Sequence, residues 1–136
     1  MGGEGVERDT VDQVAHQMRA QPQGSGWYAM FPIVNSVGKP GHLPGQTDAL
    51  RDHLFDLRRK GFNRLLQNGR MFEFSTPESL LDIDFAQPLF GLVDRLAISP
   101  DLHQRLVDAV EICFREAGEV VFEMATGEQS LRFSEK

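Results

Sequence analysis

The segment "LVDRLAISPDLHQRLVDAVE", residues 92–111, gathers side chains whose types could do chemistry. It holds two aspartates, an arginine and a histidine at short spacing: Asp94, Arg95, His103 and Asp108. Its pattern predicts a buried strand, a Ser-Pro-Asp turn and a helix, and helix N-termini at such junctions often bind phosphate. The segment is therefore a candidate active site, anion cradle or partner-binding surface.

The predicted start of this helix argues against the anion cradle. Ser99 suits the N-cap position and Pro100 the first helical position. Asp101 then places a carboxylate in the first turn, where the helix dipole favours it and where it repels a phosphate. Asp101 and Arg105 are also spaced as an i, i+4 ion pair. The helix from Pro100 to Ala117 is thus predicted to be an ordinary amphipathic helix.

The sequence offers no catalytic or cofactor-binding motif. It contains no G-x-x-x-x-G-K-[ST], G-x-G-x-x-G, G-x-S-x-G or C-x-x-C, and its four histidines form no i, i+4 pair. Asp82 and Asp84 are a close carboxylate pair, but nothing nearby completes an oxygen cage, which favours a solvated loop. Cys113 shares a helical face with apolar residues and is predicted to be buried. We therefore expect no enzyme activity, cofactor or metal in this segment.

Asp94 and Arg95 interrupt an otherwise apolar strand. Because neighbouring side chains of a strand point to opposite faces, these two lie on different faces, and the flanking residues leave the register open. A charge at such a position is either paired within the chain or directed at a partner, and both readings are kept. Arg64, in the predicted hairpin strand "NRLL", presents the same choice.

The elements that must position these residues alternate between helices and strands. Helices are predicted over 9–18, 47–61 and 100–117, strands over 27–34, 90–98, 119–125 and 129–136, and a hairpin over 62–74. We expect an α+β (mixed α/β) fold: a single small domain, residues 10–136 after a flexible start at 1–9. Its mixed sheet would carry a β-hairpin and two to three packed helices.

Four local signals predict details of these elements. Thr10 and Gln13 have the spacing of a capping box. Thr47 is predicted to cap the second helix. Pro32 lacks an N–H, which predicts an edge strand or a bulge there. The Asn68-Gly69 pair predicts a type I′ turn.

Composition limits the classes of partner. The 136 residues carry a net charge of -6 with a pI of about 5.1, and DNA-binding surfaces are usually basic because they neutralise phosphates. The alternative is a nucleic-acid-contacting module built on a local basic patch of Arg58, Arg59, Lys60, Arg64 and Arg70. One cysteine fits a reducing, cytoplasmic compartment, no apolar run is long enough to span a membrane, and the acidic charge favours a monomer.

An ordered set of segments resembles a known family. These are "RDTVDQV", "LRRKGFNRLLQNG", "VDRLAISPDLHQRLVDAVEICFREAGEVVFE" and "LRFSEK", and the match spans about Arg8 to Lys136. They are similar to the UvrB-binding domain of UvrA, the ATPase subunit of the bacterial excinuclease in nucleotide excision repair. The resemblance implies an α/β module without ATPase machinery, excised from a longer protein that binds ATP and zinc and contacts DNA. Its implied role is to dock UvrB, so that UvrB is loaded at damaged DNA.

The resemblance also implies which residues contact UvrB. The arginines of the family's hairpin strand and of its Asp-Arg strand correspond to Arg64 and Arg95, and an acid in its helix corresponds to Asp108. Asp94 is the fourth predicted contact. Two departures, Leu66 in place of a basic residue and an acidic connection before Asp94, leave open a divergent UvrA paralogue whose module contacts nucleic acid.

Overall fold

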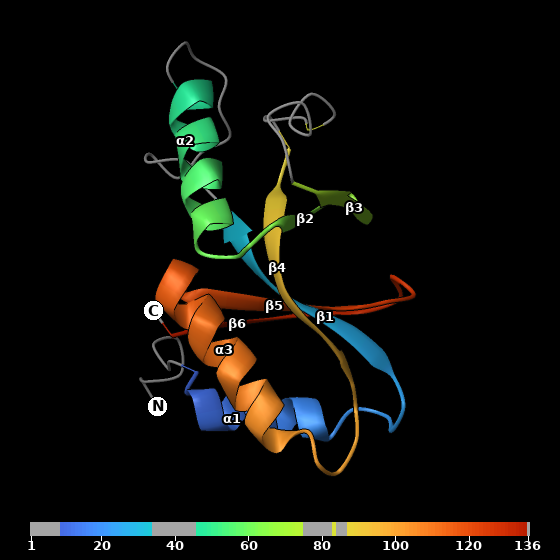
Figure 1. Ribbon diagram of the computed structural model, residues 1–136. Coiled ribbons are helices and arrows are strands. Elements are labelled where there is room, and N and C mark those ends of the chain that lie inside the picture. Colours follow the sequence, from blue (N-terminus) through green and yellow to red (C-terminus); the bar gives the residue numbers. More distant parts are fainter. Residues whose placement is uncertain (1–8, 34–45, 75–82, 84–86, 136) are drawn as a thin grey trace, which may run out of the picture. The chain divides into compact units, whose positions relative to one another are not determined.

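The computed structural model has three helices and a six-stranded sheet within the residues that it describes (Figure 1). These are residues 9–33, 46–74, 83 and 87–135, with the backbone alone for 46–50. The elements in chain order are α1 (Val11–Arg19), β1 (Gly26–Ile33), α2 (Gln46–Arg59), β2 (Arg64–Gln67), β3 (Arg70–Glu73), β4 (Leu89–Ala97), α3 (His103–Ala117), β5 (Glu119–Met124) and β6 (Ser130–Ser134). The strand order is β3-β2-β4-β1-β5-β6.

The predicted α+β class is confirmed, but the sheet is antiparallel and not mixed. β2 and β3, like β5 and β6, are joined by short turns, and such turns connect antiparallel strands only. The chain separates into two compact units. One contains the residues up to 31 and from 93 onward, and the other contains residues 32–92.

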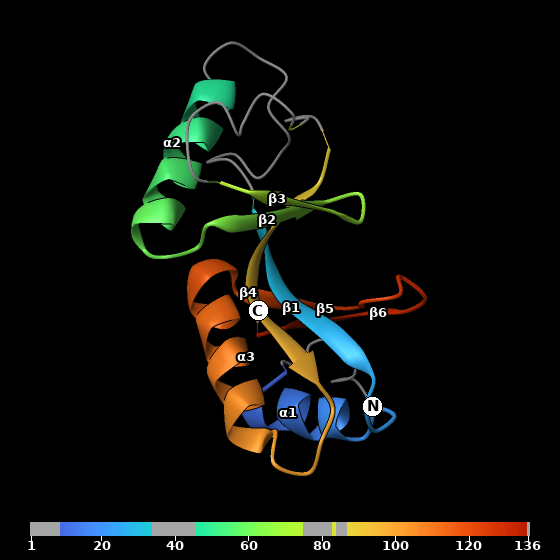
Figure 2. The same ribbon diagram turned by 45° about the vertical axis from the view of Figure 1, so that its right-hand side comes forward.

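In the first unit, two helices pack together and cover part of the sheet. α1 and α3 lie side by side in both views, and α3 also packs against β5 (Figures 1 and 2). The predicted capping box of α1 is confirmed: Thr10 Oγ1 accepts from the Gln13 N–H (3.2 Å) and Gln13 Oε1 accepts from the Thr10 N–H (3.0 Å). Cys113 is fully buried on the inner face of α3, as predicted.

The predicted start of α3 is wrong. The helix begins at His103, its N-cap is Leu102 without a side-chain hydrogen bond, and its first turn holds no acidic residue. The Ser99 carbonyl instead accepts a hydrogen bond from the Leu102 N–H (3.3 Å), which closes a turn before the helix. Leu102 is buried and its carbonyl accepts from the Leu106 N–H (2.9 Å), so helical bonding starts there. Asp101 therefore lies in the turn and is not in the first turn of α3.

Of the two alternatives predicted for the strand with Pro32, an edge position or a bulge, the edge position is wrong. β1 lies inside the sheet, between β4 and β5. Its register with β5 pairs Trp27 through Met30, so Pro32 lies beyond these pairs, and its missing N–H does not interrupt them. On the β4 side, the Ile98 N–H donates to the Ser25 carbonyl (2.9 Å) and the Gly24 N–H donates to the Ile98 carbonyl (2.8 Å).

The second unit combines α2 with the β2–β3 hairpin. Asn68 and Gly69 both have positive φ (53° and 77°), which confirms the predicted tight turn. α2 begins at Gln46, so Thr47 lies inside the helix and is not its N-cap. Leu54 and Leu57 are buried. The predicted carboxylate pair, Asp82 and Asp84, lies outside the described residues.

Candidate functional site

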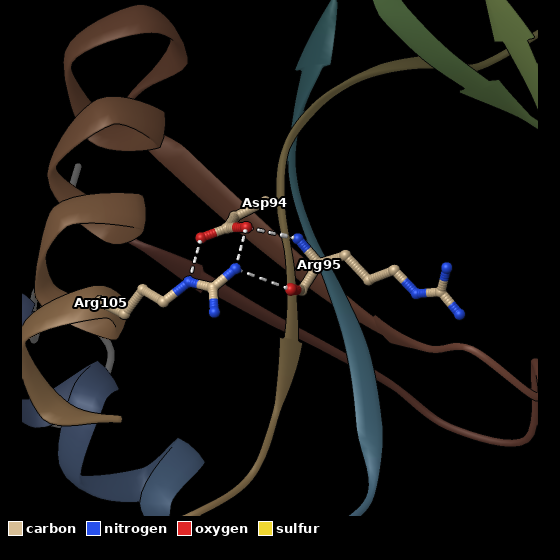
Figure 3. A network of polar contacts seen from close by, with 3 residues as sticks. All are labelled: Asp94, Arg95 and Arg105. Carbon is tan, nitrogen blue, oxygen red and sulfur yellow. Dashed lines mark hydrogen bonds and ion pairs between the residues drawn. The ribbon is translucent and has the colours of Figure 1, made fainter. Parts of the chain in front are cut away.

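The centre of β4 presents two opposite charges to two opposite sides. Asp94 points toward α3, whereas the Arg95 side chain extends away from that helix (Figure 3). Asp94 is 28% exposed and Arg95 is exposed. Alternation along the strand produces this division, and it settles the register that the sequence leaves open.

Asp94 is paired within the chain, with Arg105 of α3. Arg105 Nε donates to Asp94 Oδ2 (3.0 Å) and Arg105 Nη2 donates to Asp94 Oδ1 (2.9 Å), a two-pronged contact that suits the planar guanidinium (Figure 3). Hydrogen bonding to Asp94 and its negative charge raise the pKa of Arg105 above its ordinary value. For Asp94, then, the structure selects the intrachain ion pair, and it supplies a partner for Arg105 other than the predicted Asp101.

Arg95 is in a different situation from its neighbour. Its guanidinium carbon lies 5.8 Å from the centre of the Tyr28 ring on β1, within range of a cation–π contact. Across the described part of the chain, no acidic side chain pairs with Arg95. The structure therefore leaves a positive charge on the surface that is supported by an aromatic ring and open to an external anion.

Asp108 lies on the exposed side of α3, one turn after Arg105. Its carboxylate accepts a hydrogen bond from Gln104 Nε2 (2.9 Å), and within the described residues it forms no ion pair. His103, which the sequence places in the same segment, is exposed at the first position of α3. The two residues share a helix and do not combine with a nucleophile in the part of the chain that is described.

Arg64 belongs to the other compact unit. It is the first residue of β2, is exposed, and lies opposite Glu73 of β3 in the hairpin register. Among the described residues no hydrogen bond or ion pair holds its guanidinium. As with Arg95, its charge is available at the surface of its own unit.

The described residues hold no group of three or more His, Cys, Asp or Glu side chains that could bind a metal ion. The single thiol, Cys113, is buried, and burial together with the nearby Glu116 carboxylate raises its pKa to about 12, so it is a poor nucleophile at neutral pH. None of the helices in the described ranges is long and apolar enough to cross a membrane.

Arg105 was not predicted as the partner of Asp94. The available signal was Asp94 itself, because Leu92 and Leu96, two residues away on either side, occupy the same face of the strand and are buried. A carboxylate among such neighbours costs free energy unless a cation or donor reaches it. In the structure that cation is Arg105, at the start of the following helix.

The fold and the site define a small α+β domain that displays isolated charged side chains on its surface. Comparison with known sequences gives the family: the chain belongs to the UvrA interaction domain family, which matches residues 9–126. This confirms the family that the sequence segments indicate.

Two similar proteins are each named UvrABC system protein A. The chain is 31% identical over 112 residues to the UvrABC system protein A of Brucella abortus, covering 82% of this chain and 10% of that protein. It is 29% identical over 138 residues to the UvrABC system protein A of Mesorhizobium japonicum, covering 95% of this chain and 13% of that protein. The chain thus spans about a tenth of the length of the curated relatives it matches.

Proposed function

We propose that this domain docks a UvrB-type protein through charged surface side chains, as part of a longer UvrA-type protein acting in nucleotide excision repair. Membership of the UvrA interaction domain family supports a role in protein contact. The observation that carries the proposal is Arg95, whose exposed guanidinium lies over Tyr28 and has no acidic partner in the described part of the chain.

The proposed contacts are Arg95, Arg64 and Asp108, each exposed on its element. Carboxylates of the partner would meet the two arginines, and a basic side chain would meet Asp108. Charges placed in this way raise the association rate and set the docking register more than they add bulk affinity. Asp94, the fourth predicted contact, already accepts three hydrogen bonds within the chain, which leaves it less to offer a partner.

A titration of the domain with UvrB by calorimetry tests this function. We expect Arg95→Ala to lower the affinity by about tenfold or more, as for a central interface arginine, and Arg64→Ala and Asp108→Asn to lower it less. Raising the salt from about 0.05 M to about 0.3 M should weaken binding, because exposed charges are screened. Arg19→Ala is the matched control: Arg19 is an exposed arginine in the last turn of α1, and its loss should leave the affinity within about twofold. Absence of binding by the wild-type domain, or binding indifferent to salt and to both arginines, would contradict the proposal.

ATP and zinc belong to the longer protein in this proposal, and both would bind outside this domain. The described residues of the domain contain no set of three metal-ligand side chains, so they do not fit a zinc site.

A nucleic-acid contact is the second candidate, and one observation favours it. Residues 51–74 hold six Lys or Arg and three Asp or Glu, although the whole chain is acidic. Arg58 lies over the Phe74 ring (5.8 Å) and Arg70 over the Phe72 ring (4.9 Å), while Arg59 pairs with Asp56 (2.7 Å). If this candidate holds, a mobility shift with duplex DNA should weaken steeply with salt and should respond to Arg58→Ala and Arg70→Ala.

A further inference from the structure

We propose that Arg105 is a positioning residue that holds the main chain of β4 where Arg95 faces outward. The inference rests on the proposed docking role of Arg95 and adds a residue on another element, which itself makes no contact with the partner. We call the side chains of Asp94 and Arg105 with the main chain of Arg95 the Asp94–Arg105 clamp.

The clamp is a closed set of four hydrogen bonds (Figure 3). Two join the Arg105 guanidinium to the Asp94 carboxylate, from Nε at 3.0 Å and from Nη2 at 2.9 Å. Nη2 also donates to the Arg95 carbonyl (3.3 Å), and the Arg95 N–H donates to Asp94 Oδ1 (2.8 Å). Both main-chain polar groups of Arg95 are therefore bonded to the clamp.

The direction of these groups explains why a clamp is needed. Successive residues of a strand direct their N–H and C=O groups to alternate edges. Ile98 bonds toward Gly24 and Ser25, which lead into β1, so Arg95, three residues earlier, directs its groups to the other edge of β4. On that edge Gly91, four residues before Arg95, is paired with Leu65 of β2. At Arg95 the side chains of Asp94 and Arg105 bond the main chain instead.

The clamp also fixes the directions of the Asp94 and Arg95 side chains. A twist of β4 about its own axis at Arg95 would break the bonds to both its N–H and its C=O. Without them, the Arg95 side chain would sample other directions than the one over Tyr28. The guanidinium would then be disordered in the free domain, and ordering it on binding would cost free energy and lower the affinity.

Arginine is required for this geometry. Its guanidinium offers Nε and Nη2 in a rigid planar fork, whereas the lysine ammonium is a point charge on a flexible stem. Arg105→Lys therefore keeps the charge next to Asp94 but cannot reproduce the fork, and Arg105→Gln removes the charge as well. Arg115→Gln is the matched control, because Arg115 is an exposed arginine of the same helix whose nearest carboxylate, on Glu116, lies at 3.6 Å.

The first measurement needs no partner. Amide hydrogen exchange and the NMR resonance of the Arg95 side-chain Nε–H, which senses the Tyr28 ring, are recorded for the wild-type domain and for each variant. In Arg105→Gln the Arg95 amide should exchange about five- to tenfold faster and the Nε–H resonance should move toward its free value, while amides in the middle of α3 stay protected. Arg105→Lys should show part of this change and Arg115→Gln none. An Arg95 amide and side chain unchanged in Arg105→Gln would overturn the clamp, whether or not UvrB binds.

The second measurement is a double-mutant cycle with UvrB. Arg105→Gln should lower the affinity about two- to fivefold in the wild-type background and should have no effect when Arg95 is already alanine. An equal loss in both backgrounds would make Arg105 an independent contact and would overturn the positioning role, as would wild-type affinity in Arg105→Gln. If the wild-type domain does not bind UvrB, the proposed function fails, and hydrogen exchange still decides whether the clamp holds Arg95.

Discussion

At the scale of single residues, Cys113 shows how burial determines the state of a side chain. Its thiol is fully buried and its pKa is raised to about 12, first by burial and then by the Glu116 carboxylate. The ordinary value, which applies to the unfolded chain, is 9.0. Between these two values the unfolded chain releases a proton that the folded chain keeps, so this contribution to stability is complete below about pH 9 and is lost as the pH rises toward 12.

We expect this loss to appear in urea unfolding between pH 7 and pH 10.5. Because other groups also titrate there, the measured quantity is the difference in unfolding free energy between wild type and Cys113→Ala. The difference should be constant up to about pH 9 and then shrink by up to about 1.4 kcal/mol per pH unit. A constant difference over the whole range would show that the folded thiol ionises at its ordinary pKa.

Asp94, Arg95 and Arg105 show what could and could not be predicted for single residues. The choice between intrachain pairing and an open charge was visible in the sequence, but its answer differs for Asp94 and Arg95, because adjacent strand residues face different surroundings. The spacing of Asp101 and Arg105 predicted a local pair. The turn from Ser99 to Leu102 instead brings Arg105 back toward a residue eleven positions earlier, and only the path of the chain could reveal that.

At the scale of elements, the hairpin of the second unit depends on its turn. Asn68 and Gly69 both adopt positive φ, and a Cβ added at Gly69 would meet nothing within 4 Å. Gly69→Ala should therefore cost about 1–2 kcal/mol through backbone conformation alone. Asn68→Gly is the control, since glycine adopts positive φ freely, and its melting temperature should stay close to that of the wild type. Equal melting temperatures for Gly69→Ala and the wild type would contradict the type I′ geometry.

The capping box of α1 gives a second prediction for an element. Thr10→Ala removes the acceptor of the Gln13 N–H and should lower the unfolding free energy by about 1 kcal/mol. Thr10→Ser keeps the hydroxyl and should retain most of the stability. Chemical denaturation of the three proteins checks this, and a Thr10→Ala variant as stable as wild type would mean that solvent satisfies the N–H equally well.

Element ends were predicted well where one motif had one meaning. Thr10 with Gln13 and Asn68 with Gly69 are examples, and the structure confirms both. The Ser-Pro-Asp motif has two meanings, because proline suits both the first position of a helix and the second position of a turn. The sequence suggested both, and the structure has the turn, which ends at the buried Leu102.

At the scale of the whole molecule, sheet order lay beyond the sequence. Residue types predicted which segments are strands. They did not predict that β1 lies between β4 and β5, because that depends on contacts between segments far apart in the chain. Pro32 suggested an edge or a bulge because its missing N–H was assigned to the paired part of the strand. In the structure the pairs with β5 end at Met30, so the proline carries no such penalty there.

Asp9, before α1, and Ser134, the last residue of β6, are joined by hydrogen bonds. The Asp9 N–H donates to the Ser134 carbonyl (2.9 Å), and the Ser134 N–H donates to Asp9 Oδ2 (2.9 Å). A circular permutant that links these ends by about six Gly/Ser residues and opens the chain after Gly127, in the exposed turn between β5 and β6, should keep the wild-type circular dichroism and a cooperative melt. A permutant opened between Val93 and Asp94 is the control and should not fold. Failure of the first permutant would contradict the adjacency of the ends.

The neighbouring placement of Asp94 and Arg95 has a consequence for how this domain tolerates change in length. One residue anchors β4 to α3 and the next faces the opposite side, so inserting or deleting a single residue just before them, within β4, would exchange their directions. The acid would then face solvent and the arginine would face the helix that already carries Arg105. We therefore expect related sequences to differ in this part of β4 by substitution and not by insertion or deletion of an odd number of residues. The loop between β5 and β6 has no such constraint on its length.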